Sequence, residues 1–99
     1  MIFNSSTVKE YILSGARFVA TIRRRGQYML GKRVVVKVGD KKFHGEVVGI
    51  VPITPLSLGE YVSYSGFESV EDWLNEARRL HGTEIDSNKY EVIIVRVVT

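Results

Sequence analysis

The sequence predicts an α+β fold in which a small curved β-barrel of mixed strands is flanked by short helices. Three observations support this fold class. Strand-like and helix-like apolar patterns follow one another in the order α-β-β-β-α-α-β. The longest expected strand contains Gly45 and Gly49, where we expect a bulge or sharp bend that curves the sheet. The chain has 99 residues, so we expect a single domain over 1–99 with one core.

Three helices are expected from capping signals and apolar periodicity. Thr7 to Glu10 has capping-box spacing and predicts an amphipathic helix that ends at Ser14-Gly15. A proline in the first turn predicts a second helix over about 54–64. Ser69 caps the third helix, whose apolar stripe includes Trp73 as a core residue, and Gly82 ends it.

Four strands are expected, over Arg17–Arg23, Arg33–Val38, Phe43–Val51 and Tyr90–Val98. Because side chains alternate along a strand, Phe18, Ala20 and Ile22 suit the core, and the other face can border a cleft. That cleft-bordering set comprises Arg17, Val19, Thr21 and Arg23. The last strand is apolar at nearly every position, which predicts a central strand covered on both faces.

Charge is distributed unevenly between the two halves of the chain, whose net charge is +3. Residues 1–50 carry ten Lys/Arg against three acidic residues, whereas residues 51–99 carry four against eight. Arginine offers five fixed donors that suit phosphate or carboxylate. The strand that delivers Arg23, Arg24 and Arg25, with Lys32 and Arg33 just beyond, therefore indicates an anion-binding site. A solvated strand end that only keeps the chain soluble is the alternative.

Several classes of site are not expected. The chain has no cysteine, so we expect no disulfide, thiol nucleophile or thiolate metal site. His44 and His81 lack carboxylates at ligand spacing and are interpreted as surface or strand residues, so no metal or cofactor is expected. No apolar run suggests a signal peptide or a spanning helix, so we expect no membrane partner and a cytoplasmic protein.

The order of five short motifs resembles the ASCH domain family, which is named for homology to activating signal cointegrator-1 and has a PUA-like fold. The resemblance covers about residues 3–98. In sequence order the motifs are Ile12-Leu13-Ser14-Gly15 followed by a basic residue, Thr21-Ile22-Arg23, Tyr28 to Gly31 before a strand, Gly66-Phe67-Glu68-Ser69 before a helix with Trp73, and a final Val/Ile strand.

This resemblance implies a barrel whose cleft binds RNA or a nucleobase-like ligand and is lined by the Thr-Ile-Arg segment. Thr21 and Arg23 carry over directly, and nearby loop residues can join them. Arginines can grip phosphate or a carbonyl edge, and a tyrosine can stack on a base. The predicted ligand- or RNA-binding residues are Arg17, Thr21, Arg23, Arg25, Tyr28, Lys32 and Ser65.

Some members of the resembled family are similar to amidohydrolases of acetylated cytidine, which use a lysine, the strand threonine and a helical glutamate. The lysine position is Phe18 or Arg17 here, and the glutamate position is Ser65. Neither phenylalanine nor a permanently charged arginine is a useful base near neutrality. We therefore expect no catalytic residue of this type.

The sequence favours a binding module for single-stranded RNA, a modified base or a nucleotide-like anion. An RNA-processing enzyme in the same cleft is the alternative, as an amidohydrolase or as a ribonuclease using His44 and Glu46. A third class is a protein adaptor that would use the acidic helix face formed by Glu71, Asp72 and Glu76. The oligomeric state and the identity of the RNA are left open.

Overall fold

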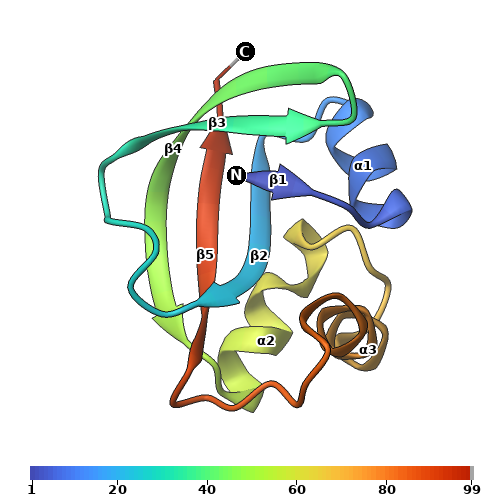
Figure 1. Ribbon diagram of the computed structural model, residues 1–99, viewed down its shortest axis with the longest axis vertical. Coiled ribbons are helices and arrows are strands. Elements are labelled where there is room, and N and C mark those ends of the chain that lie inside the picture. The colour runs from blue at the N-terminus through green and yellow to red at the C-terminus, as the bar shows by residue number, and fades with distance from the viewer. Residues whose placement is uncertain (99) are drawn as a thin grey trace.

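The computed structural model describes residues 1–98, which form a five-stranded mixed sheet curled into a half-barrel, with three short α-helices packed against it (Figure 1). This confirms the predicted α+β class with a small curved barrel and flanking helices. In chain order the elements are β1 (Ile2–Phe3), α1 (Ser6–Leu13), β2 (Phe18–Arg24), β3 (Arg33–Val38), β4 (Lys41–Pro52), α2 (Pro55–Tyr61), a 3₁₀ turn (Val62–Tyr64), α3 (Val70–His81) and β5 (Tyr90–Val97).

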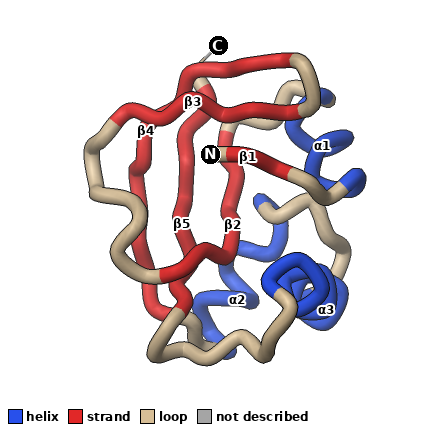
Figure 2. The backbone as a smooth tube through the Cα atoms, in the orientation of Figure 1, coloured by secondary structure: helices blue, strands red, loops and turns tan. Residues whose placement is uncertain are grey.

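The sheet has the strand order β1-β3-β4-β5-β2, so β1 and β2 are its two edges. β1 pairs with β3 in parallel, and the other neighbours are antiparallel. The curl brings the two edges toward each other, and the Arg23 side chain of β2 donates a hydrogen bond to the Ile2 carbonyl of β1 at 2.8 Å. Figure 2 shows the short β1 strand crossing the open side of the half-barrel. We call the gap between these edges the seam.

Two apolar clusters fill the two sides of the sheet. The inner cluster lies inside the half-barrel and includes Val19, Val36, Val47, Ile93 and Val95. The outer cluster packs the sheet against α2 and α3 through residues such as Ile22, Leu58, Trp73, Val92 and Ile94. The last strand is therefore covered on both faces from Tyr90 to Val95, as its apolar sequence predicted, whereas Arg96 is exposed.

The expected division of β2 into a core face and a cleft face is partly wrong. Val19 was assigned to the cleft face, yet it has no exposed surface because the half-barrel closes over it. Phe18 was assigned to the core, yet it is 37% exposed because α2 and α3 do not reach that end of the strand. Each face of β2 is thus buried over part of its length. Of the predicted cleft-bordering set, Thr21 and Arg23 line one cavity and Arg17 lines a different one.

The bend in β4 lies where its glycines predicted it. The pairing register with β5 shifts between Val47 and Gly49, which marks a bulge at Val48. A Cβ atom at Gly45 would lie 2.7 Å from Val95 Cγ1 and 3.2 Å from the backbone oxygen of Arg96. β4 therefore crosses β5 too closely for any larger residue at that position, and this close crossing helps to curl the sheet.

Helix ends follow the capping signals in α3 but not in α1. The Ser69 hydroxyl accepts a hydrogen bond from the Asp72 backbone N–H, and Gly82 ends α3 with a φ of 70°. α1 begins at Ser6 rather than Thr7, and the Ser5 hydroxyl at its N-cap makes no capping bond. The capping box predicted over Thr7–Glu10 is wrong because Thr7 lies inside α1. The residue at the N-cap is Ser5, and its hydroxyl donates to Glu76 of α3 instead.

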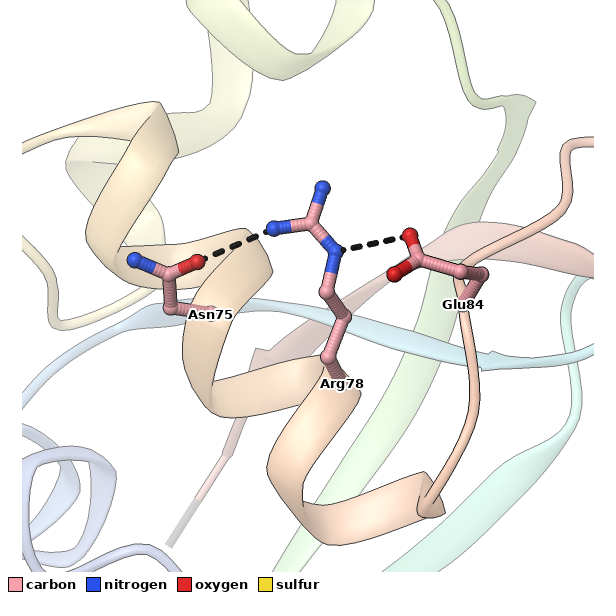
Figure 3. Close-up of polar contacts among 3 residues, drawn as sticks. All are labelled: Asn75, Arg78 and Glu84. Atoms are coloured by element: carbon pink, nitrogen blue, oxygen red, sulfur yellow. Dashed lines mark hydrogen bonds and ion pairs between the residues drawn. The ribbon is translucent and has the colours of Figure 1, made fainter.

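Arg78 fixes the chain after α3. Its Nε donates to Glu84 Oε2 at 3.1 Å, and its Nη1 donates to Asn75 Oδ1 at 2.9 Å (Figure 3).

Residues 1–98 contain no helix that has the length and apolar character needed to cross a bilayer.

Candidate functional site

A cavity of about 170 Å³ lies at the seam, between the two edge strands and α3. We call it the seam cavity. Its walls come from three parts of the chain that are far apart in sequence, namely the first eight residues, β2, and α3 with Phe67 before it. The lining residues are Ile2, Phe3, Asn4 and Ser5 at the N-terminal end, Val8 of α1, Thr21, Ile22 and Arg23 of β2, and Phe67, Trp73, Glu76, Ala77, Leu80 and His81 in and before α3.

Arg23 is held in a fixed position on the β2 side of the seam cavity. Its Nε donates to Thr21 Oγ1 at 3.1 Å and its Nη2 donates to the Ile2 carbonyl at 2.8 Å. The guanidinium carbon lies 4.8 Å from the centre of the Phe3 ring, in cation–π geometry. Burial lowers the pKa of Arg23 from its ordinary value, but arginine remains a cation at neutral pH.

One donor group of Arg23 stays available to a ligand. The contacts above use Nε and Nη2, and no side-chain nitrogen or oxygen among the described residues is both buried and without a partner. Nη1 therefore has no hydrogen-bond partner within residues 1–98 and is not fully buried. A guanidinium with two nitrogens anchored and the third open is preorganised for binding, because little side-chain entropy is lost when a ligand arrives.

Glu76 places a carboxylate on the α3 side of the same cavity. Its Oε2 accepts a hydrogen bond from the Ser5 hydroxyl at 2.9 Å, and its Oε1 accepts one from Arg79 Nε. The hydrogen bond from Arg79 lowers the pKa of Glu76 below its ordinary value, and the Ser5 bond acts in the same direction. The seam cavity is therefore of mixed charge, with a cation on β2 and an anion on α3, where the sequence predicted a basic cleft.

The lowered pKa of Glu76 predicts a pH-dependent contribution to folding. Because the folded-state pKa lies below the ordinary value of 4.5, Glu76 stabilises the fold above about that pH and loses the contribution as pH falls through the folded value. Glu76→Gln should therefore lower the free energy of unfolding modestly at pH 7 and by less at pH 3, measured by urea unfolding. Glu60→Gln, on the exposed part of α2, is the control. An equal loss from Glu76→Gln at both pH values would contradict this assignment.

His81 closes one end of the seam cavity. Its Nε2 lies 3.3 Å from the Ile22 carbonyl, and its ring packs edge-on against Tyr90 with centroids 4.8 Å apart. The Val97 N–H donates to the Arg17 carbonyl, so the odd-numbered residues of this segment are the ones that hydrogen-bond to β5. The Ile22 carbonyl therefore points away from β5, off the free edge of the sheet, where it meets His81 of α3. His81 thus meets an edge group of β2 that no strand covers.

The structure brings together only part of the predicted site. Thr21 and Arg23 share the seam cavity. Tyr28 packs against the inner cluster and lies close enough to Arg23 to influence its pKa. Arg25 is exposed beside the same strand end, with its Nε 3.8 Å from Glu91 Oε1.

Three other predicted residues lie outside the seam cavity. Arg17 directly precedes β2, at the end of the strand opposite to Arg23, where it lines a hollow of about 500 Å³ together with Arg96. Lys32 is exposed at the end of the β2–β3 loop. Ser65 is buried, and its hydroxyl donates to the Val62 carbonyl and accepts from the Phe67 N–H, so it is occupied in the turn before α3. The basic residues of the first half therefore form separate groups in the fold.

The candidate catalytic positions are also dispersed. Phe18 lies on the outer face of β2, with its ring 5.9 Å from that of Tyr64, and it does not share a cavity with Thr21. His44 and Glu46 line a separate hollow on the outer surface of β3–β5. Within residues 1–98, no three His, Asp or Glu side chains are grouped so as to hold a metal ion.

Sequence reasoning missed the α3 side of the seam cavity. Glu76 was noticed only as part of an acidic helix face, His81 was assigned to the surface, and Ser5 was not considered. Ser5 and Glu76 are 71 positions apart, and neither forms a local motif with Arg23. The available signal was the i, i+4 spacing of Trp73, Ala77 and His81, which places these residues on one helical face.

The comparisons place the chain beside one viral relative. No family model matches the chain, and no solved structure matches it. The chain is 53% identical, over 95 residues, to Uncharacterized protein 105 of Sulfolobus islandicus rod-shaped virus 1, and the match covers 96% of this chain and 90% of that protein. The chain therefore belongs to the same protein family as Uncharacterized protein 105 of that virus.

Proposed function

We propose that the chain is an ASCH-type, PUA-like binding module whose seam cavity holds one base of single-stranded RNA, including a modified base. One observation carries this proposal. A fixed guanidinium, that of Arg23, and an ionised carboxylate, that of Glu76, line the same small cavity from β2 and from α3. The Thr-Ile-Arg segment, which implied the cleft in the resembled family, lines this cavity.

A nucleobase fits this arrangement of donors and acceptors. The edge of a base offers both carbonyl or ring-nitrogen acceptors and N–H donors. Arg23 Nη1 can donate to a carbonyl oxygen or ring nitrogen of the base, and the Glu76 carboxylate can accept from an N–H group of the base. Phe3 and Trp73 supply apolar walls, and a flat aromatic ligand gains from such surfaces.

The size and charge of the cavity favour a base over a phosphate. A volume of about 170 Å³ is below the roughly 300–1,000 Å³ of pockets for drug-sized ligands, so a group of one or two rings is expected. Glu76 would repel a phosphate inside the cavity, because two anions close together in a partly buried site interact unfavourably. Phosphates of the same strand would instead lie outside, near the exposed Arg24 and Arg25.

Chemical-shift mapping tests the proposal. A short single-stranded RNA of mixed sequence, titrated into ¹⁵N-labelled protein, should shift the amide signals of Ile2, Thr21, Arg23 and Ala77 together. A DNA duplex of equal charge should leave these signals in place, because its bases are not free to enter a cavity. Saturable RNA binding without shifts at these residues, or no binding at low salt, would refute the proposal.

A further inference from the structure

A part of the outer sheet surface that no helix covers carries a concentration of cations. α2 and α3 cover the outer face through residues near Ile22, Val92 and Ile94, and the remaining part of β3, β4 and β5 is open. Side chains there alternate with valines that point into the half-barrel. We call this surface the outer basic face, and it comprises Arg33, Lys37, Lys42, His44 and Arg96.

Opposing charges are scarce on the outer basic face. Glu46 is its one acidic residue within the described chain, and it is paired with Arg96 at 2.9 Å. Lys37 and Lys42 lie directly opposite each other in the β3–β4 pairing. Like charges in directly opposed positions destabilise a sheet. An anion bound between the two lysines would remove this repulsion.

The outer basic face also has a shape that suits an anion. A hollow of about 200 Å³ lies between Arg33 and Arg96, and His44 and the Arg96-paired carboxylate of Glu46 also line it. Because Glu46 already has Arg96 as a partner, Arg33 is free within residues 1–98 to meet a ligand there. The cations are thus spread across three adjacent strands, whose spacing is about 4.8 Å, rather than gathered at one point.

Exposed aromatic and apolar side chains continue this surface toward α2. Phe18 and Tyr64 are 37% and 40% exposed and contact each other edge-to-face. Together with Val48 and Tyr61 they line a second hollow, of about 260 Å³. Arg96 pairs directly with Phe18 across β5 and β2, so the aromatic pair is adjacent to the cations. Cations beside exposed aromatic rings are the combination that binds single-stranded nucleic acids, through phosphates and base stacking respectively.

We infer that the outer basic face binds the phosphodiester backbone of a single-stranded nucleic acid, with an adjacent base stacked on Phe18 and Tyr64. This inference rests on the proposed function for the class of ligand, but it concerns a different surface. The two surfaces are close, because Lys37 pairs with Ile2, whose carbonyl receives Arg23 in the seam. One nucleic-acid strand can therefore place a base in the seam cavity and phosphates farther along its backbone on β3 and β4.

The test uses fluorescence anisotropy with a labelled 12-nucleotide oligouridine and the matching oligodeoxythymidine, at several salt concentrations. The double variant Lys37→Gln/Lys42→Gln removes two phosphate contacts. It should lower the slope of log affinity against log salt by about 1.4 and weaken binding about 25-fold at 0.1 M salt. Lys9→Gln/Lys89→Gln removes the same charge from α1 and from the loop before β5, and should retain a larger share of the wild-type affinity and slope.

Further variants and competing ligands distinguish base stacking, the seam cavity and non-specific anion binding from one another. Tyr64→Ala should weaken oligouridine binding about tenfold with an unchanged slope, because stacking does not release counterions. Arg23→Ala should remove the preference for particular bases. The loss of salt slope caused by Lys37→Gln/Lys42→Gln should persist in the Arg23→Ala background. These two results distinguish the proposal for the seam cavity from the inference for the outer basic face. The double lysine variant should melt no lower than wild type, because a repulsion has been removed. A wild-type slope in that variant, or equally tight binding of heparin or anionic vesicles by wild type, would overturn the inference.

Discussion

Arg23→Ala is expected to weaken the binding of a short single-stranded RNA roughly 10- to 150-fold, which corresponds to about 1.5–3 kcal/mol for hydrogen bonds to a charged group. Arg23 faces the seam cavity and is held there by Thr21 and Ile2. Arg24, its neighbour, projects from the other face of β2, with its guanidinium 5.7 Å from the Tyr90 ring centre. Arg24→Ala should therefore cost no more than about fivefold, as expected for one phosphate contact at 0.1 M salt.

Matched anisotropy titrations at one salt concentration measure this difference. Arg23 also joins the two sheet edges, so both variants are compared by thermal melting, and Arg23→Lys keeps the charge while it loses the guanidinium fork. Arg23→Lys should bind more weakly than wild type if geometry matters as well as charge. Equal losses from Arg23→Ala and Arg24→Ala would indicate a diffuse basic patch instead of a defined pocket.

Trp73→Ala is expected to lower the free energy of unfolding by roughly 3–5 kcal/mol. Trp73 is only 4% exposed and joins α3 to the outer cluster, while one side of it lines the seam cavity. Its removal would leave a void beside an existing cavity, and the packed strands around it have little freedom to close over the space.

Urea unfolding monitored by circular dichroism gives the measurement. Leu56→Ala is the matched control, because Leu56 is 73% exposed on α2 and its truncation opens no cavity. That variant should change the free energy of unfolding by less than about 0.5 kcal/mol. A loss below about 1 kcal/mol for Trp73→Ala would contradict the packing described here.

The sequence was sufficient for most of the fold because local signals agreed with the final structure. The glycines of β4 lie at a true bend. Ser69 and Gly82 mark the two ends of α3. The unbroken apolar run of β5 reflects burial on both faces of the sheet. β1 was not predicted, because two residues carry no periodicity and their parallel pairing with β3 is a contact between distant segments. Without β1 the seam has only one edge, so its cavity was not foreseeable as a whole.

The candidate site shows the same limit. Thr21 and Arg23 were predicted to share a face because strand alternation is local. Ser5 and Glu76 are in contact only when the sheet is curled and α3 is packed on it. No short sequence pattern predicts such a long-range contact. Arg17 was grouped with Arg23 because alternation put both on one face of the strand predicted over Arg17–Arg23. In the structure Arg17 precedes β2 and lines a different hollow from Arg23.

Trp73 fluorescence tests most directly whether a base enters the seam cavity. It is the single tryptophan of the chain, and its side chain lines that cavity. Titration with a short single-stranded RNA should produce a saturable change in Trp73 emission, with the same midpoint as binding measured by anisotropy, and Arg23→Ala should remove the emission change. Tight binding by anisotropy with unchanged Trp73 emission, together with wild-type affinity in Arg23→Ala, would contradict the account.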